Sequence, residues 1–251
     1  MHTFRTRFAK DIVAEFLPPK KTSHDVIIFC DGMPGLPGKK KTLMEFFSKK
    51  GYWAFNPRYR GVWESGGSFL EESPVEDICD VIDGLYQPIT SIWDNVEYNI
   101  DPEHIIIVGG SFGGPAALLL SFDPRVLAVV TVAGVVDWTQ QVETEPLDWL
   151  YDVTKASFGE AFRMTRKNWD KLKTGTFYNP ITQLENIDPK KVLMIHAKDD
   201  TVVPYEITKR FVQKMGISLI SLKKGDHVSS SILTKWRIWR QVKKHLASLI
   251  L

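Results

Sequence analysis

The sequence contains little of what marks several large classes of protein. Its 251 residues include only two cysteines, Cys30 and Cys79, which are too few and too far apart for a disulfide framework. We therefore expect both to be free thiols in a reducing cytoplasm. Cysteine and histidine nowhere cluster with the spacing of metal ligands, and the glycine-rich stretch 109–114 is not followed by the lysine of a phosphate-binding loop. We accordingly expect no bound metal and no cofactor.

Long apolar runs and a strong excess of one charge are also missing. No apolar stretch is long enough to cross a membrane, and the first residues lack the apolar core of a signal peptide. Because the formal net charge is only +2, nothing indicates a nucleic-acid partner. The lysine runs 39–41 and 223–224 are interpreted as solvated turns and helix ends. No internal repeat or low-complexity linker interrupts the chain, so we predict a single domain over residues 1–251.

What the sequence does contain is an alternation of short apolar runs and helical stretches. Runs typical of buried strands lie at 25–30, 51–56, 104–108, 126–136, 191–196 and 217–222. Helical stretches lie at 42–50, 74–86, 115–120 and 229–249. Residues 12–17 read as an antiparallel edge strand. This alternation predicts an α/β fold with a mostly parallel central sheet flanked by helices.

Ser111 stands between Gly109 and Gly113, at the junction of an apolar strand and an apolar helix. A tight turn there leaves no space for a side chain two positions before or after the serine, which explains both glycines. The turn raises the hydroxyl above the sheet, and the helix N-terminus offers free N–H groups to a developing oxyanion. This order predicts a nucleophile elbow with Ser111 as the nucleophile. The alternative is a glycine-rich loop without a chemical role.

A serine nucleophile needs an acid and a base, which follow it in that order in proteins with such an elbow. Asp200 comes just after the apolar run 191–196, at the edge where open α/β sheets place their sites. We predict Asp200 as the acid, with its neighbour Asp199 as the alternative. Asp137, after the preceding strand, is the candidate if both fail. The non-catalytic interpretation is an aspartate that caps a helix or a turn.

His227 is the predicted base because it lies on a loop after the last predicted strand. The other five histidines are in the wrong place: two precede the elbow, one begins its strand, one lies inside the strand before Asp200, and one lies on the last helix (His2, His24, His104, His196 and His245). The oxyanion needs two N–H donors, one of which is expected from the loop 31–35. Because Pro34 has no N–H, Met33 is the best-placed donor there, and Phe112 supplies the other.

Together these motifs resemble the α/β-hydrolase superfamily, and within it the dienelactone-hydrolase and prolyl-oligopeptidase-like branch. The matching pieces are 31–35, 56–61, 109–114, 196–204 and 225–227. In the family's usual His-Gly-x-x-Asp-x-x-Val-Pro motif the acid aligns with Asp200, which favours Asp200 over Asp199. The resemblance runs from about residue 25 to the end. It implies an α/β-hydrolase fold and the chemistry of a serine hydrolase.

The chain departs from the family pattern at three positions. Asp31 stands where the family has histidine before the oxyanion loop, and a carboxylate there disfavours a nearby oxyanion unless it is turned away to brace the loop. Ala197 replaces a glycine. Dienelactone hydrolases proper use cysteine where this chain has Ser111, so their particular reaction is not implied. These 251 residues also leave no room for the propeller of prolyl oligopeptidases.

The alternation stops in an aromatic-rich stretch before the acid. We expect residues 139–186 to form a helical cap insert, with Trp149, Phe158 and Phe162 against the substrate. The alternative is that these rings pack the insert onto the body. Arg58 or Arg60 is a candidate for binding a substrate carboxylate, although arginines in such loops more often brace the loop itself.

These observations predict a serine hydrolase that cleaves a small carboxylic ester through an acyl-enzyme. A short-peptide or acyl-amide hydrolase is the second interpretation, and a non-catalytic binding protein on the same fold is the third. The sequence is compatible with a homo-oligomer and identifies neither the acyl group nor the leaving group.

Overall fold

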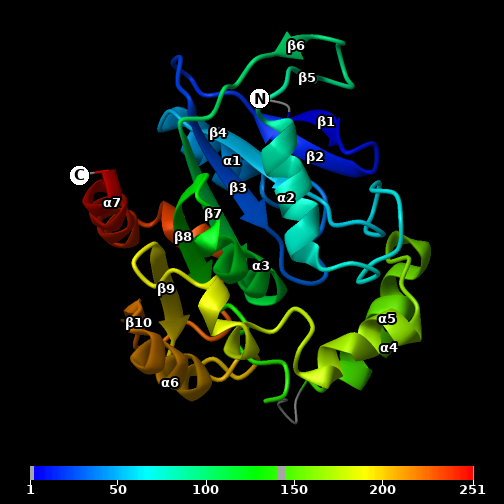
Figure 1. Cartoon of the computed structure of the whole chain (residues 1–251), viewed down its shortest axis with the longest axis vertical. Coiled ribbons are helices and arrows are strands. Elements are labelled where there is room, and N and C mark those ends of the chain that lie inside the picture. Colours follow the sequence, from blue (N-terminus) through cyan, green and yellow to red (C-terminus); the bar gives the residue numbers. More distant parts are fainter. Residues whose placement is uncertain (1–2, 141–144, 251) are drawn as a thin grey trace.

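The computed structural model describes residues 3–140 and 145–250, which form a twisted central sheet with helices on both faces (Figure 1). Within those residues the main sheet has eight strands in the order β1-β2-β4-β3-β7-β8-β9-β10. Strands β4 to β10 of this order run parallel, whereas β2 pairs antiparallel with both β1 and β4. The predicted α/β fold with a mostly parallel sheet is confirmed.

The strands of the main sheet are β1 (Phe4–Phe8), β2 (Ile12–Leu17), β3 (Asp25–Cys30), β4 (Trp53–Pro57), β7 (His104–Gly110), β8 (Val126–Val132), β9 (Val192–Ala197) and β10 (Ser218–Leu222). A separate hairpin pairs β5 (Ile89–Thr90) with β6 (Glu97–Tyr98). The helices are α1 (Lys41–Lys49), α2 (Pro74–Gly84), α3 (Gly114–Leu119), α4 (Leu147–Phe158), α5 (Arg166–Asp170), α6 (Tyr205–Met215) and α7 (Trp236–Ile250). In the described residues no helix is both long and apolar enough to span a membrane.

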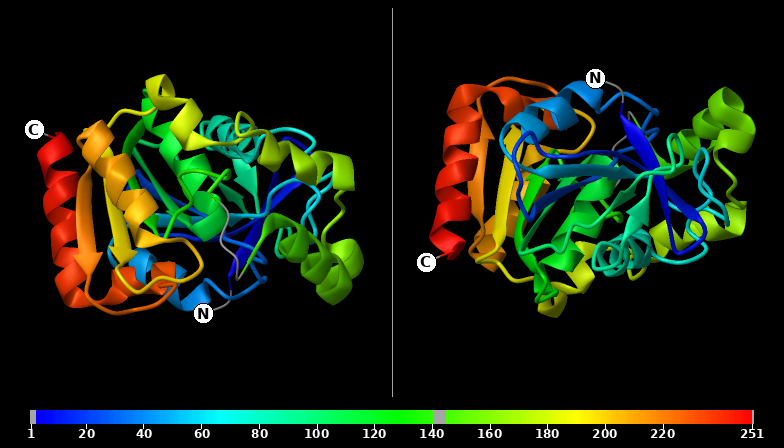
Figure 2. Two further views of the ribbon diagram at one scale, coloured as in Figure 1. Left: turned by 90° about the horizontal axis from the view of Figure 1, so that it is seen from below. Right: turned by 90° about the horizontal axis from the view of Figure 1, so that it is seen from above.

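Alternate residues of the central strands supply two separate hydrophobic cores. In β7, Ile105 and Ile107 face the core formed with α2, α3 and α6, whereas Ile106 and Val108 face the core formed with α1 and α7. Figure 2 shows these helices on opposite sides of the sheet. Burying apolar side chains on both faces leaves only the ends of the strands for polar chemistry.

The structure corrects the predicted position of one strand, the end of another strand and the start of the last helix. Residues 12–17 form a strand as predicted, but β1 lies outside it and is the edge of the sheet. The strand predicted over 126–136 ends at Val132, because Ala133 turns to a φ of 49°. The helix predicted over 229–249 is divided into a 3₁₀ turn, Ser230–Thr234, and then α7.

The stretch between β8 and β9 contains α4, α5 and several 3₁₀ turns, so the predicted interruption of the alternation is present. Helices α4 and α5 project from the body of the molecule (Figure 2). They are fastened to the loop after β4 by backbone hydrogen bonds from Trp63 to Ala161 and from Phe69 to Arg163, each 2.7 Å long. Residues 141–144 of the predicted insert, and residues 1, 2 and 251 of the predicted domain, lie outside the described residues.

Candidate active site

Ser111 lies on a strained turn between β7 and α3. Its φ is 49°, a conformation that costs a residue other than glycine about 1–3 kcal/mol. The flanking glycines are required by close packing: a Cβ at Gly109 would lie 2.3 Å from the Gly113 oxygen, and one at Gly113 would lie 2.2 Å from the Cys30 oxygen. The turn is thereby held tightly against the end of β3, and the serine is directed toward the carboxyl edge of the sheet.

Asp200 and His227 are in direct contact at the same edge. His227 Nδ1 lies 3.0 Å from Asp200 Oδ2 and 3.2 Å from Oδ1. Since an ionised carboxylate only accepts hydrogen bonds, Nδ1 carries the proton and Nε2 is left as the free, basic nitrogen. The backbone N–H groups of Val202 and Val203 both donate to Asp200 Oδ1 at 2.9 Å.

The Asp200 carboxylate is fully buried yet remains ionised. Burial alone raises its pKa, but hydrogen bonds from His196, His227 and the Val203 N–H outweigh that effect, so that the pKa lies well below its usual range. His196 Nε2 lies 3.2 Å from Asp200 Oδ2 and 2.8 Å from the Val203 oxygen. The sequence interpretation treated His196 only as a strand residue and missed this contact, although it belongs to the matched family motif.

The two alternative acids make other contacts. Asp199 accepts backbone hydrogen bonds from Gly225 at 2.9 Å and from Asp226 at 3.0 Å, so that it orders the turn before His227. Asp137 caps the turn that follows β8 by accepting from the Thr139 N–H and hydroxyl. Among the described residues, Asp200 is the carboxylate that contacts His227.

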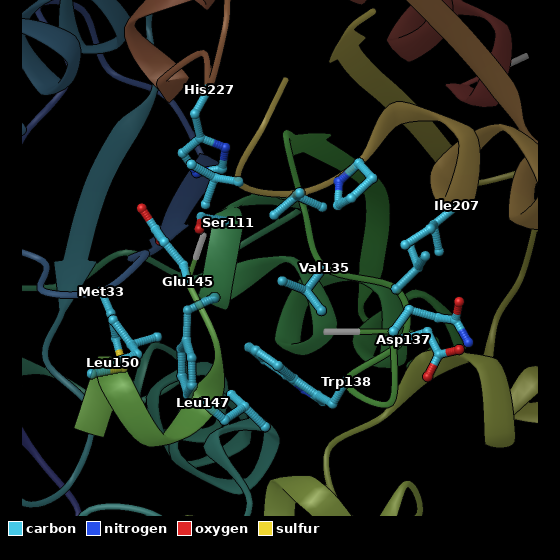
Figure 3. Close-up of a pocket in the computed structure, with 16 residues that line it drawn as sticks. Met33, Ser111, Val135, Asp137, Trp138, Glu145, Leu147, Leu150, Ile207 and His227 are labelled. Atoms are coloured by element: carbon cyan, nitrogen blue, oxygen red, sulfur yellow. The ribbon is translucent and has the colours of Figure 1, made fainter. Parts of the chain in front are cut away.

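Ser111 and His227 together line two cavities. The first, of about 230 Å³, is predominantly apolar (Figure 3). Its apolar walls are Met33, Phe112, Val135, Val136, Trp138, Leu147, Leu150, Val202, Val203, Pro204 and Ile207. The second, of about 250 Å³, lies between the loop after β3 and the loop that carries His227, and its lining includes Lys39 and Lys40.

The loop after β3 approaches Ser111 closely. A Cβ at Gly32 would lie 3.1 Å from the Ser111 Cβ, so this peptide segment packs directly against the candidate nucleophile. Met33, the next residue, lines both cavities. Phe112 is in the first turn after the elbow, where backbone N–H groups lack an intrahelical acceptor.

Asp31, the departure from the family pattern, is turned into a network of hydrogen bonds. Its Oδ1 lies 3.1 Å from Lys40 Nζ, and its Oδ2 accepts from Asn56 Nδ2 at 3.0 Å. Lys40 also donates to Ser230 Oγ at 2.7 Å. The interpretation of lysines 39–41 as solvated is therefore wrong for Lys40, which ties the loop after β3 to the loop after His227.

The residues predicted to bind substrate are not among the described residues that line the two cavities at Ser111. The arginines and the aromatic residues have different roles instead. The Arg58 side chain is only 2% exposed and pairs with Glu15 at 2.9 Å and Glu64 at 3.1 Å. Arg60 likewise forms an ion pair, with 2.6 Å between its Nη1 and Asp77 Oδ1. Both arginines therefore brace their loop, which was the alternative interpretation.

The aromatic residues chosen from the insert also need correction. Trp149 is 45% exposed on the outer face of α4. Phe158 and Phe162 pack against Trp63, with ring centroids 5.8 and 6.1 Å apart, and so fasten the insert to the body. The insert residues that do line the first cavity are aliphatic, Leu147 and Leu150, together with Trp138 from the loop before the insert.

Tyr178 connects the insert to the elbow, and no sequence signal indicated it. Its hydroxyl donates to the Phe112 oxygen at 2.8 Å and accepts from the Ala116 N–H at 3.2 Å. Nearby, Tyr59 donates to the Asp31 oxygen at 3.2 Å. Burial raises the pKa of both phenols well above the usual value, so they remain neutral donors. They fix the backbone on both sides of the candidate oxyanion site.

The sheet order, the strained serine turn and the buried carboxylate–histidine pair define the class of the chain as an α/β-hydrolase. The model of the prolyl oligopeptidase family matches residues 40–235, and the chain belongs to that family. It is therefore an enzyme of the serine hydrolase type. The sequence matches no curated protein.

Solved structures of esterases and of a peptidase share the fold. An esterase of Pyrococcus furiosus has a TM-score of 0.69 and 18% identity, over 99% of this chain and 90% of that one. Thermogutta terrifontis Est2 with butyrate bound has a TM-score of 0.64 and 16% identity, over 98% and 94%. Pyrococcus horikoshii acylaminoacyl peptidase has a TM-score of 0.63 and 20% identity, over 98% of this chain but 40% of that one.

Proposed function

We propose that the protein hydrolyses small carboxylic esters through an acyl-enzyme, with Ser111 as nucleophile, His227 as base and Asp200 as acid. One observation carries the proposal: the Asp200–His227 hydrogen bond, 3.0 Å long, lies at the same cavities as a serine on a strained elbow. No residue type required for a serine hydrolase is missing from this group, and no cofactor enters the reaction that we propose.

In this mechanism, His227 Nε2 accepts the proton of Ser111 as its oxygen bonds to the substrate carbonyl carbon. The negative charge moves to the carbonyl oxygen, which receives hydrogen bonds from the backbone N–H groups of Met33 and Phe112. His227 then donates the proton to the leaving group as the bond to it breaks. Water repeats the sequence on the acyl-enzyme and releases the acid. Asp200 holds the imidazole in the required tautomer and stabilises its charged form.

The first cavity supports an ester with a compact apolar acyl group. Its walls are mostly aliphatic, which suits an acyl chain held by burial of apolar surface. The alternative, hydrolysis of short acyl-peptides, is favoured by membership of the prolyl oligopeptidase family. A panel of p-nitrophenyl esters of rising chain length, beside aminoacyl and dipeptidyl p-nitroanilides, distinguishes them. Faster cleavage of the anilides would replace the ester proposal with the peptidase one.

We also propose that residues 139–186 act as a partial cap within a single domain, with Leu150 limiting the length of the acyl chain. Leu150→Ala should shift the preferred ester toward longer chains, because each added methylene that is buried contributes about 0.8 kcal/mol, roughly fourfold in kcat/KM. Trp149→Ala is the matched control, since Trp149 is the adjacent residue on α4 but is exposed. An unchanged ratio of octanoate to butyrate hydrolysis in Leu150→Ala would contradict this role.

Besides the three proposed catalytic residues, Lys40 should affect kcat, because it neutralises the Asp31 carboxylate next to the proposed oxyanion site. In Lys40→Met the Asp31 carboxylate loses its ion pair and keeps only the neutral hydrogen bond from Asn56, so its negative charge opposes the oxyanion. We expect kcat to fall about tenfold or more with a smaller change in KM. Adding Asp31→Asn removes that charge and should restore part of the lost kcat. Steady-state kinetics of the two single variants and the double variant provide the measurement. A double variant slower than Lys40→Met would show that the charge of Asp31 is not the cause.

A further inference from the structure

The two cavities that share Ser111 and His227 differ in the charge of their walls. The first includes the carboxylates Asp137 and Glu145 and, among its described lining residues, no lysine or arginine. The second includes Lys39, Lys40 and a single carboxylate, Asp31. The serine therefore lies between an apolar cavity with acidic residues in its wall and a cavity lined by cations.

Only one of the two lysines in the second cavity has its charge compensated. Lys40 is paired with Asp31 at 3.1 Å and also donates to Ser230. Lys39 is exposed, and within residues 3–140 and 145–250 its ammonium makes no ion pair or side-chain hydrogen bond. The wall of the second cavity thus carries one uncompensated positive charge. The other residues around it include the hydroxyl groups of Ser229 and Ser230.

We propose that the second cavity binds the leaving group of the substrate, and that this group carries an anion, a carboxylate or a phosphate, that pairs with Lys39. The inference rests on the proposed function and deepens it by assigning a substrate class. An acyl chain suits the aliphatic first cavity, where Asp137 and Glu145 disfavour an anion. The leaving group then occupies the other side, next to His227, which lines both cavities and protonates it.

The class of substrate that follows is an apolar acyl group esterified to a small hydroxy acid or to a phosphorylated alcohol. Ser111 forms the new ester bond to the acyl carbon as the bond to the leaving oxygen breaks, and that oxygen takes the proton held by His227. The anion itself takes no part in these bonds. It contributes by pairing with Lys39, which orients the leaving oxygen toward the imidazole.

Matched butyrate esters test this assignment in the 251-residue chain. The substrates are the butyrate esters of 4-hydroxybenzoate, of 4-hydroxyphenyl phosphate and of the neutral 4-hydroxybenzamide. The measured quantity is the ratio of kcat/KM for each anionic ester to that for the neutral one. Because this ratio is compared between variants, differences in the intrinsic reactivity of the esters cancel.

We expect Lys39→Met to lower the ratio about threefold to fivefold, as for a partly exposed ion pair, and Lys39→Glu to lower it further. Lys41→Met, which removes an exposed lysine two residues away that does not line the cavity, should leave the ratio unchanged. Raising the salt concentration should reduce the ratio in the wild-type protein but not in Lys39→Met. Whichever anionic ester shows the larger Lys39-dependent ratio identifies the anion as carboxylate or phosphate.

A ratio that is the same in wild type and Lys39→Met for both anions would overturn the inference. An equal loss in Lys41→Met would also overturn it, because the effect would then be the general field of the lysine run. These outcomes differ from a failure of the proposed function, in which the wild-type protein would hydrolyse none of the esters, the neutral one included.

Discussion

Ser111→Ala is expected to reduce the turnover of p-nitrophenyl butyrate by several orders of magnitude, because the acyl-enzyme cannot form without the serine oxygen. The remaining rate reflects binding and oxyanion stabilisation, which act without the serine. The measurement is kcat at saturating substrate. Turnover within about tenfold of the wild-type value would exclude Ser111 as the nucleophile.

Two further variants distinguish the loss of the nucleophile from a loss of folded protein. Ser231→Ala, at an exposed serine of the 3₁₀ turn Ser230–Thr234, should leave turnover unchanged. Ser111→Gly should be as inactive as Ser111→Ala but should unfold at a higher temperature than Ser111→Ala, because glycine adopts a φ of 49° without strain. If Ser111→Gly is inactive although it unfolds well above the temperature of the assay, its inactivity cannot be due to unfolding.

Asp200→Asn is expected to reduce kcat by roughly 10⁴, since the amide favours the wrong imidazole tautomer and no longer stabilises the imidazolium. Asp199→Asn is the matched control at the adjacent residue. Its amide oxygen still accepts the hydrogen bonds from Gly225 and Asp226, so we expect only a small effect. A larger loss in Asp199→Asn than in Asp200→Asn would reverse the assignment. If both effects are small, Asp137 is the remaining candidate from the sequence.

The parts of the site that could be predicted from sequence are those set by local backbone geometry. A Cβ at Gly109 or at Gly113 would lie 2.3 Å or less from a backbone oxygen, so the glycine spacing of the motif directly reflects the packing. Asp200 and His227 could be proposed because parallel strands bring their carboxyl ends to one edge. Their mutual contact at 3.0 Å agrees with that proposal.

The parts that could not be predicted depend on contacts between distant segments. Lys40 looks like its neighbours Lys39 and Lys41 in the sequence, and its different role arises from Asp31 and from Ser230 on the far side of the site. Arg58, in the loop after β4, forms an ion pair with Glu15 on β2. In both cases the residue type was noted, but its partner was not visible in the local pattern.

The missed first strand and the misassigned aromatic residues have separate physical reasons. The β1–β2 hairpin turns through Ala9 and Lys10, with φ of 45° and 67°, where glycine or asparagine would normally signal the turn. In the insert, large aromatic residues were predicted to line the substrate pocket, but Phe158 and Phe162 pack against Trp63. The smaller Leu147 and Leu150 line the first cavity because they occupy the inner face at the start of α4.

The most direct test of the account is the identification of the residue that a fluorophosphonate probe modifies. We expect one adduct, found by peptide mass spectrometry on Ser111. It should form at a rate that falls sharply in Asp200→Asn, and it should be absent in Ser111→Ala. An adduct on another residue, or none in a protein that hydrolyses p-nitrophenyl butyrate, would contradict the proposal that Ser111, His227 and Asp200 perform the reaction.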